Sequence, residues 1–299
     1  MAFSREPNAE PIPGYRLICP LGSGGFGEAW KCEAPGGIHK AVKFVFGNLN
    51  SSDVDAARAE QEMKALERVK LIRYPFILQM DLIKKVDGEL IFIMELADKS
   101  LHDACEEAKA AGLVGIPRDS LLRYMRDSAD ALDHMNEKHG LQHLDIKPRN
   151  LFMVSDRVKV ADFGLVKCLE RSGMSGTMGG VTPLYAPPET FKGEISPQSD
   201  QYSLAIVYQE MLTGHRPFNA KNARLLALQH MNEARDLRSL PVPDRAIVAR
   251  ALEKDPTKRF PSCMAFVLAL YNARTPTFAN INLDAEMAHA PSREAPTTA

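Results

Sequence analysis

Short runs of β-forming residues dominate the first third of the chain. Each run is bounded by glycine or by a turn dipeptide, and this spacing favours strands over helices. Two of the runs flank Asp87-Gly88, a dipeptide that favours a tight hairpin. We predict strands at residues 15–21, 28–33, 39–46, 78–86 and 90–96.

Hydrophobic residues in other segments recur every three or four positions, which is the period of a helix with one buried face. One such stripe predicts a helix over residues 54–71, inside the strand-rich part of the chain. Further stripes lie in the second part, where strand-like runs become rare. They predict helices at residues 120–139, 204–212 and 264–271.

These patterns divide the chain into a small strand-rich part with one main helix, about residues 15–96, and a larger helical part, about 97–272. We predict an α+β fold of two lobes, with a cleft between them where a ligand could bind. The proline-rich residues 1–14 are predicted to be a flexible lead-in, and residues 273–299 a flexible tail or linker.

The composition narrows the classes of partner. The 299 residues carry a net charge of −1, with 37 basic and 38 acidic side chains, so no basic field favours nucleic acid or an anionic membrane. No run of 18 apolar residues occurs, so we expect no membrane span. The five cysteines are widely spaced without a C-x-x-C pair, and we expect a reducing, cytoplasmic location.

The segment Gly22-Ser23-Gly24-Gly25-Phe26-Gly27 matches a G-x-G-x-x-G pattern. Glycines at these positions let backbone N–H groups approach phosphate oxygens closely. In a dinucleotide-binding fold the pattern opens a helix, whereas here a strand-like run and a Pro35-Gly36-Gly37 turn follow. This order favours a hairpin that covers phosphates, and a simple glycine-rich turn is the alternative at this point.

Lys43 lies on the predicted strand that follows this loop. A lysine buried at a phosphate site needs a carboxylate partner to hold its charge. The helix predicted at residues 54–71 offers Glu62, which lies beside the apolar stripe that faces inward. We predict Glu62 as the partner of Lys43, with Glu60 as the alternative, and a solvated helix face as the third possibility.

The stretch from His143 to Asn150 contains an acid, a cation and an amide close together. Pro148 cannot occupy an ordinary helix interior, so the stretch is predicted to be a loop that carries functional groups. Asp145 could accept a proton from a substrate hydroxyl, and Lys147 could neutralise charge on a transferring phosphoryl group. Asn150 could ligate Mg²⁺ through its amide oxygen.

Asp162-Phe163-Gly164 follows this loop and supplies a second oxygen ligand of the kind that Mg²⁺ prefers. Two short apolar runs flank Ser155-Asp156 between the two motifs, which is a hairpin pattern. Such a hairpin would bring Asn150 and Asp162 to neighbouring strand ends. Each residue alone has an ordinary explanation as a turn or cap residue, and it is their order and spacing that favour a functional site.

Taken in order, these motifs resemble the signature set of the eukaryotic-type protein serine/threonine kinase family, over about residues 15–272. The resemblance implies a two-lobed protein-kinase-like fold that uses ATP and Mg²⁺. It implies that Asp145 is the catalytic base and that Lys43, paired with Glu62, holds the phosphates. The nucleotide-binding set that it implies comprises Leu21, Gly22, Gly24, Gly25, Phe26, Gly27, Ala29, Ala41, Lys43, Met94, Glu95, Leu96, Asn150 and Asp162, with the last two as metal ligands.

The resemblance extends to parts of the chain outside the catalytic loop. Met94-Glu95-Leu96 resembles the hinge that hydrogen-bonds adenine, with Met94 at the back of the pocket. Glu189 is expected to pair with Arg259. The helix that begins near Asp200 is expected to anchor the catalytic loop from below.

Lys147 and the segment Thr182-Pro183-Leu184-Tyr185 resemble the serine/threonine branch of the family, and the chain resembles its bacterial members. Leu144 departs from the pattern, because the family usually has an arginine there that pairs with a phosphorylated residue of the activation loop. We therefore expect activity without that phosphorylation, although the loop offers Ser172, Ser175 and Thr177.

The function that the resemblance implies is transfer of the γ-phosphate of ATP to serine and threonine hydroxyls of a protein substrate. The first alternative is a pseudokinase scaffold that binds nucleotide without catalysis. Such proteins usually lack a catalytic group, whereas the lysine, the base and both metal ligands are present here. The second alternative is a small-molecule phosphotransferase, and the peptide-platform pattern of residues 182–189 argues against it.

Overall fold

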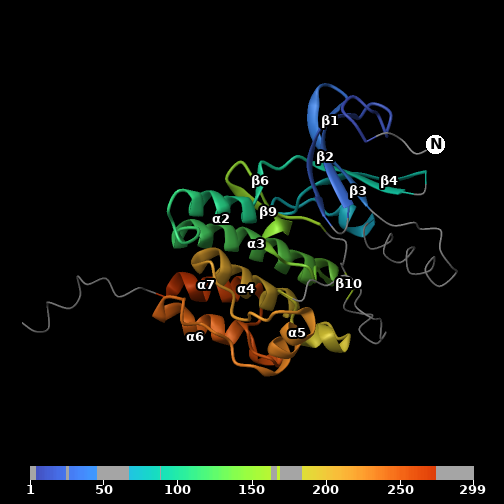
Figure 1. Ribbon diagram of the computed structural model, residues 1–299. Coiled ribbons are helices and arrows are strands. Elements are labelled where there is room, and N and C mark those ends of the chain that lie inside the picture. The colour runs from blue at the N-terminus through green and yellow to red at the C-terminus, as the bar shows by residue number, and fades with distance from the viewer. Residues whose placement is uncertain are drawn as a thin grey trace, which may run out of the picture.

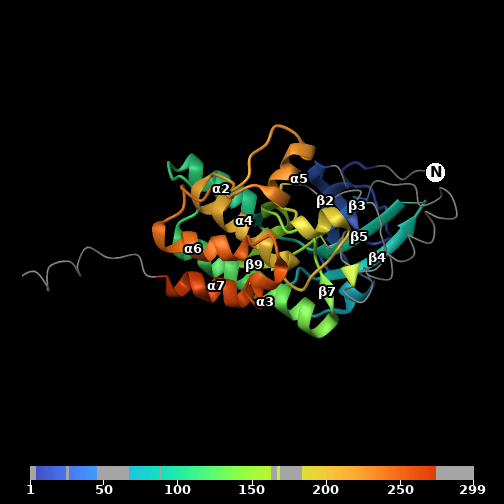
Figure 2. The same ribbon diagram turned by 90° about the horizontal axis from the view of Figure 1, so that it is seen from below.

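The computed structural model describes residues 5–24, 27–45, 67–87, 89–162, 167–168 and 184–273. These residues form a strand-rich lobe and a larger helical lobe (Figure 1). Seen from below, the long helices stack on one side of the molecule and the strands of the smaller lobe lie on the other (Figure 2). The predicted α+β, two-lobed fold is therefore confirmed.

The smaller lobe contains a five-stranded sheet in the order β1-β2-β3-β5-β4, in which every neighbouring pair is antiparallel. β4 and β5 pair as a hairpin, as the Asp87-Gly88 dipeptide predicted, although Gly88 itself lies outside the described residues. The strands are Arg16–Gly24 (β1), Gly27–Ala34 (β2), Ile38–Val45 (β3), Met80–Val86 (β4) and Glu89–Glu95 (β5).

The two faces of this sheet contribute to separate hydrophobic clusters, because alternate residues of a strand point to opposite sides. Val42, Phe44 and Ile93 are fully buried in one cluster, which belongs to the smaller lobe alone. Phe92 points to the other face and joins the core that continues into the helical lobe. Lys43 stands directly opposite Phe92 and so shares the face that meets the helical lobe.

Residues 5–14 pack against the first of these faces, although the sequence predicted a flexible lead-in. Ile12 is only 4% exposed and belongs to the same cluster as Val42 and Phe44. The backbone N–H of Leu17 donates to the carbonyl of Ala9 at 2.9 Å. The proline-rich composition gave no sign of this packing, because two apolar residues, Ala9 and Ile12, form no periodic stripe that would indicate a partner face.

Two central helices organise the larger lobe, α3 (Arg118–His139) and α4 (Ser199–Thr213). Thirteen of the fifteen residues of α4 are buried. A helix buried on all sides shows no amphipathic stripe, so the predicted range 204–212 covered only its apolar centre. The other helices are α2 (Leu101–Ala110), α5 (Ala223–Asn232), α6 (Val242–Ala251) and α7 (Cys263–Asn272).

Short strands and 3₁₀ turns connect these helices to the site. β8 (Leu151–Val154) and β9 (Arg157–Val160) form a hairpin to which β6 (Lys99–Ser100) adds a third strand, and β7 (Leu141–Gln142) pairs with β10 (Lys167–Cys168). The 3₁₀ turns are Pro148–Asn150, Pro188–Lys192 and Pro256–Lys258. Across the described ranges, none of the helices combines the length and apolar character that a membrane crossing requires.

The segment before β4 joins the two lobes. Residues 67–71 form the end of the helix predicted at 54–71, and the remainder of that helix lies outside the described residues. Tyr74 then stacks on His134 of α3, with ring centroids 3.8 Å apart, and its hydroxyl donates to Asp130 at 2.5 Å. Further along, Leu78 donates its backbone N–H to the carbonyl of Val160 at 2.9 Å. The smaller lobe is thereby fixed to α3 and to β9.

Candidate active site

The β8–β9 hairpin brings the two predicted metal ligands close together. Leu151 pairs with Val160, and the backbone N–H of Ala161 donates to the carbonyl of Asn150 at 2.9 Å. Asn150 and Asp162 therefore flank the open end of one hairpin. The hairpin predicted from the apolar runs around Ser155-Asp156 is confirmed.

Asp145 lies in a loop that surrounds its carboxylate with donors. The carboxylate accepts from the ammonium group of Lys147 at 2.7 Å and from the side-chain amide of Asn150 at 3.0 Å. The amide of Asn150 also donates to the backbone carbonyl of Asp145 at 2.8 Å. Asp145 is only 8% exposed, so its orientation is fixed before any substrate arrives.

Asp200, at the start of α4, anchors this loop from below. Its carboxylate accepts the backbone N–H groups of His143 at 2.7 Å and Leu144 at 2.8 Å. Burial raises the pKa of Asp200, while His143 and the two N–H groups act in the opposite direction. A ring nitrogen of His143, Nε2, lies 2.9 Å from the carbonyl oxygen of Ala161, so the same loop is also tied to the residue before Asp162. The anchoring role expected of the helix is confirmed.

Lys43 and Asp162 meet across the interface between the lobes. The ammonium group of Lys43 lies 2.6 Å from the Asp162 carboxylate. Asp162 adopts a left-handed backbone conformation, with φ of 64°, which turns the chain directly after the hairpin. Glu62, the predicted partner of Lys43, lies outside the described residues together with Glu60, Phe163 and Gly164, so that pairing stays a prediction.

The glycine-rich segment connects β1 and β2, as predicted for a hairpin. Gly24 pairs with Gly27 at its end, and Gly25 and Phe26 lie outside the described residues. A Cβ at Gly27 would lie 2.1 Å from the carbonyl oxygen of Phe44, so only glycine fits at that position. At the other end, Leu21 is half exposed and Gly22 has no neighbour within 4 Å of its would-be Cβ.

The sheet collects the other predicted nucleotide-binding residues on the face of Lys43. Ala29 stands opposite Lys43, and Ala41 stands opposite Met94. Because directly opposed residues of antiparallel strands share a face, all four side chains point toward the helical lobe. Ala41 is buried and Met94 is partly buried against the main core. This face has the apolar character that a planar base requires, with one lysine at its edge.

The predicted hinge includes a contact that the sequence did not reveal. Both carboxylate oxygens of Glu95 lie within 2.8 Å of the ammonium group of Lys159 on β9. The backbone N–H of Glu95 donates to the carbonyl of Gln79 at 2.9 Å. Leu96 follows in a half-buried position. The hinge is thus joined to the hairpin that ends at Asp162.

The segment from Leu184 to Lys192 is held against the helical lobe by several polar contacts. Glu189 and Arg259 form a buried pair with two N–O distances of 2.8 Å, as the sequence predicted. The hydroxyl of Tyr185 donates to Glu210 at 2.7 Å. Burial, with the nearby Glu210 carboxylate, raises the pKa of Tyr185 well above its ordinary value, so it stays a neutral donor.

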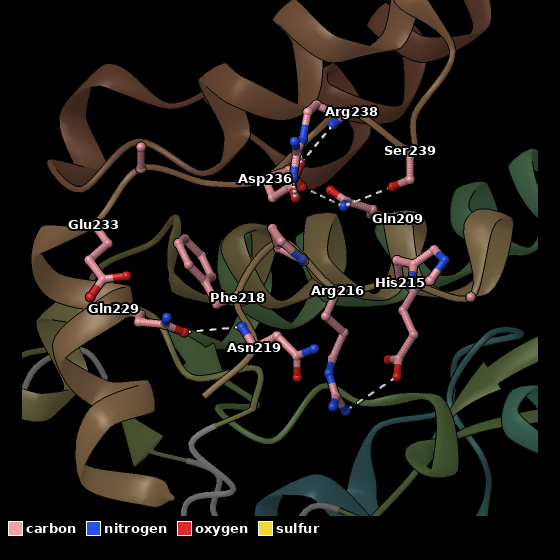
Figure 3. Close-up of a pocket in the computed structure, with 14 residues that line it drawn as sticks. Gln209, His215, Arg216, Phe218, Asn219, Gln229, Glu233, Asp236, Arg238 and Ser239 are labelled. Atoms are coloured by element: carbon pink, nitrogen blue, oxygen red, sulfur yellow. Dashed lines mark hydrogen bonds and ion pairs between the residues drawn. The ribbon is translucent and has the colours of Figure 1, made fainter. Parts of the chain in front are cut away.

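A cavity of about 770 Å³ lies beside this segment, where α4 ends and the following loop leads to α5 (Figure 3). Its lining includes Glu210, the partner of Tyr185, but none of the predicted catalytic or nucleotide-binding residues. Arg216 lies 3.4 Å from Glu210, and Arg238 lies 2.7 Å from Asp236. Most of the charge in the cavity is thus paired within the protein.

The side-chain oxygens of Asn150 and Asp162 are suitable ligands for a small divalent cation. Asn150 uses its amide nitrogen to hold Asp145, which leaves the amide oxygen as the atom that could bind a metal. Asp162 adds a carboxylate from the neighbouring end of the hairpin. Mg²⁺ typically takes one or two protein oxygens and completes its shell with phosphates and water, so these two residues fit Mg²⁺ with a bound nucleotide.

Comparison with known sequences identifies the family to which this arrangement of residues belongs. The sequence model for the protein kinase domain family matches residues 15–269. The serine/threonine-protein kinase PknF of Mycobacterium tuberculosis is 28% identical over 270 residues, and the probable serine/threonine-protein kinase PknB of Lactococcus lactis is 28% identical over 225 residues. These alignments cover 86% and 74% of this chain, but 56% and 35% of the two relatives. The chain thus spans about half of one relative and a third of the other.

A solved structure shows the same fold. The kinase domain of PknI from Mycobacterium tuberculosis, a cysteine-to-alanine mutant, superimposes with a TM-score of 0.66 at 23% sequence identity. The superposition covers 91% of this chain and 96% of that one. The likeness therefore extends over most of both chains.

Proposed function

Because this chain belongs to the protein kinase family, we propose that it transfers the γ-phosphate of ATP to serine and threonine hydroxyls of a protein substrate. One observation carries the proposal. Lys43 from the sheet and Asp162 from the end of the β8–β9 hairpin meet at 2.6 Å, beside the buried loop that carries Asp145. This is the arrangement needed to hold a triphosphate between the lobes.

The proposed roles follow from the charges around the loop. The transition state of phosphoryl transfer is loose and highly charged, so catalysis depends mainly on positioning and electrostatics. Asp145 orients the substrate hydroxyl and accepts its proton. Lys147, 2.7 Å from the same carboxylate, offsets charge on the phosphoryl group in transit. Lys43 holds the α- and β-phosphates, with Glu62 as its second partner.

Asn150 and Asp162 are proposed as the metal ligands. Mg²⁺ bound there would supply positive charge next to the phosphates. The amide nitrogen of Asn150 meanwhile keeps Asp145 in place, so one residue serves both the base and the metal site. The apolar face around Ala41 and Met94 receives the adenine ring, and the backbone of Glu95 and Leu96 supplies its hydrogen bonds.

A protein substrate is favoured over a small molecule by the segment that ends at Glu189. The buried Glu189–Arg259 ion pair and the Tyr185–Glu210 hydrogen bond hold this segment in place as a platform for a peptide. A kinase is favoured over the pseudokinase alternative because the chain retains Lys43, Asp145, Asn150 and Asp162, the groups that such a scaffold usually lacks. We further propose a cytoplasmic location for this domain, which the free thiols of Cys19, Cys32, Cys105 and Cys263 support.

The proposal is tested by incubating the purified protein with γ-labelled ATP and casein, in Mg²⁺ and in EDTA. We expect label on phosphoserine and phosphothreonine in Mg²⁺ and its loss in EDTA, because the phosphates need the metal. Nucleotide binding without transfer would instead identify a pseudokinase. Label that appears only on an added small molecule would point to the second alternative.

A further inference from the structure

The residues that precede the match to the protein kinase domain form part of the sheet lobe. The match begins at residue 15, yet residues 5–14 lie against the sheet (Figure 1). Asn8 donates its backbone N–H to the carbonyl of Leu17 at 2.8 Å, and Leu17 donates in return to Ala9. Ile12 completes the cluster of Val42 and neighbouring apolar residues. This strap covers a sheet face that would otherwise expose large hydrophobic side chains to water.

Arg5, in the strap, contacts three strands at once. Its guanidinium lies 3.3 Å from Glu28 on β2 and 2.5 Å from Glu89 on β5. It also lies over the ring of Phe44 on β3, 5.0 Å from the ring centroid. The Arg5 side chain is 23% exposed, so these contacts are shielded from water more than those of an ordinary surface pair.

Glu28 links Arg5 to the glycine-rich loop. It directly follows Gly27, the residue that packs against the backbone of Phe44. One oxygen of Glu28 accepts from the indole N–H of Trp30 at 2.7 Å, and the other faces Arg5. Trp30 is only 5% exposed, so the Glu28 side chain is held on both sides. The base of the phosphate-covering loop is thereby fixed to β3 and, through Arg5, to β5.

We propose that Arg5 is a positioning residue for ATP binding, which acts through Glu28 on the glycine-rich loop. The inference rests on the proposed kinase function, because the loop matters only if it covers the phosphates. Without Arg5, the carboxylates of Glu28 and Glu89 lose their shared cation, and the base of the loop loses its link to β5 while its contacts with Trp30 and Phe44 remain. ATP binding then has to order the loop, which weakens affinity without altering the groups that carry out transfer.

The test compares Arg5→Met with Arg16→Met in the full chain. Arg16 is the control, because it forms an ion pair with Glu33 at 2.6 Å across β1 and β2, the two strands that the glycine-rich loop joins, at the end far from the loop. At a temperature where circular dichroism shows all proteins folded, Arg5→Met should raise the KM for ATP about fivefold with kcat unchanged. Arg16→Met should leave both constants at the wild-type values.

Two further variants separate positioning from simple stabilisation. Arg5→Lys keeps the charge between the two carboxylates and should restore most of the affinity for ATP. Glu28→Gln should raise the KM for ATP as well. The double variant Arg5→Met/Glu28→Gln should raise the KM no further than either change alone, since both substitutions break the same Arg5–Glu28 ion pair. An unchanged KM in Arg5→Met, an equal rise in Arg16→Met, or additive effects of Arg5 and Glu28 would overturn the inference.

The same variants are assayed for binding of a fluorescent ATP analogue, which requires no phosphate transfer. A fivefold rise in the dissociation constant for Arg5→Met supports the positioning role even if the wild-type protein transfers no phosphate. An unchanged dissociation constant rejects that role even if the wild-type protein is an active kinase. The failure of this inference is thus distinguishable from the failure of the proposed function.

Discussion

Leu144 occupies the position where a cation would couple the catalytic loop to a phosphorylated activation loop. Its side chain is 3% exposed and its backbone N–H donates to Asp200, so it is a fixed part of the loop. Its φ of 63° is unusual for a residue other than glycine and is held by the buried Asp200 carboxylate. Because leucine carries no charge with which to bind a phosphate, we expect the geometry of this loop to be independent of one.

We therefore expect phosphatase-treated protein to retain the activity of the untreated sample to within about twofold. The measurement is the initial rate of γ-phosphate transfer before and after treatment, with intact-mass spectrometry to confirm that the phosphates are gone. A Ser172→Ala/Ser175→Ala/Thr177→Ala variant serves as a control that cannot be phosphorylated again at these residues. Loss of most activity after treatment would show that another cation replaces the missing arginine.

The Glu189–Arg259 pair joins two elements that are distant in sequence. Glu189 lies in the 3₁₀ turn Pro188–Lys192, and Arg259 precedes α7. Both side chains are buried, and the guanidinium also lies over the ring of Tyr202 on α4, 4.8 Å from the ring centroid. Removing one member of a buried pair leaves the other charge uncompensated, which costs far more than the loss of an exposed pair.

Arg259→Met should lower the free energy of unfolding by about 3–5 kcal/mol, because it strands the buried carboxylate of Glu189. Urea unfolding followed by circular dichroism measures the change. Arg238→Met is the control, since Arg238 pairs with Asp236 but is 89% exposed, and we expect no measurable change in the free energy of unfolding. Equal and small effects of the two substitutions would mean that the platform segment is not held by this pair.

At the scale of the whole molecule, the sequence predicted what depends on local patterns. The strand runs and the hairpin dipeptide predicted the strands that form the sheet, and the apolar runs around Ser155-Asp156 placed Asn150 beside Asp162. The Glu189–Arg259 pair also followed from the family's pattern, because it depends on two motifs that are visible in the chain. The strands and the hairpin need no knowledge of how distant surfaces meet, whereas the Glu189–Arg259 pair was expected only from the resemblance to the family.

Contacts that depend on the packing of distant strands could not be predicted in this way. Arg5 meets Glu28 and Glu89, which are 23 and 84 residues away, and only the sheet order brings the two carboxylates together. The ion pair between Glu95 and Lys159 likewise depends on how the hinge lies over β9. The residues around Arg5 or Lys159 do not indicate which carboxylate each one pairs with. Such ion pairs can therefore be identified only in the folded structure.

We propose that Lys43 and Asp162 hold ATP between the lobes, and that Asp145 orients the hydroxyl that receives the γ-phosphate. The most direct test is the rate of γ-phosphate transfer in Mg²⁺ by wild-type protein and by Asp162→Ala, with Lys43→Met as a second variant. The control is Asp156→Ala, at the turn of the same hairpin, where the carboxylate accepts a hydrogen bond from Tyr124 at 3.2 Å. We expect both active-site variants to lose at least about 100-fold in rate while their circular dichroism spectra remain those of the wild type. Transfer by folded Asp162→Ala at the wild-type rate would contradict the account.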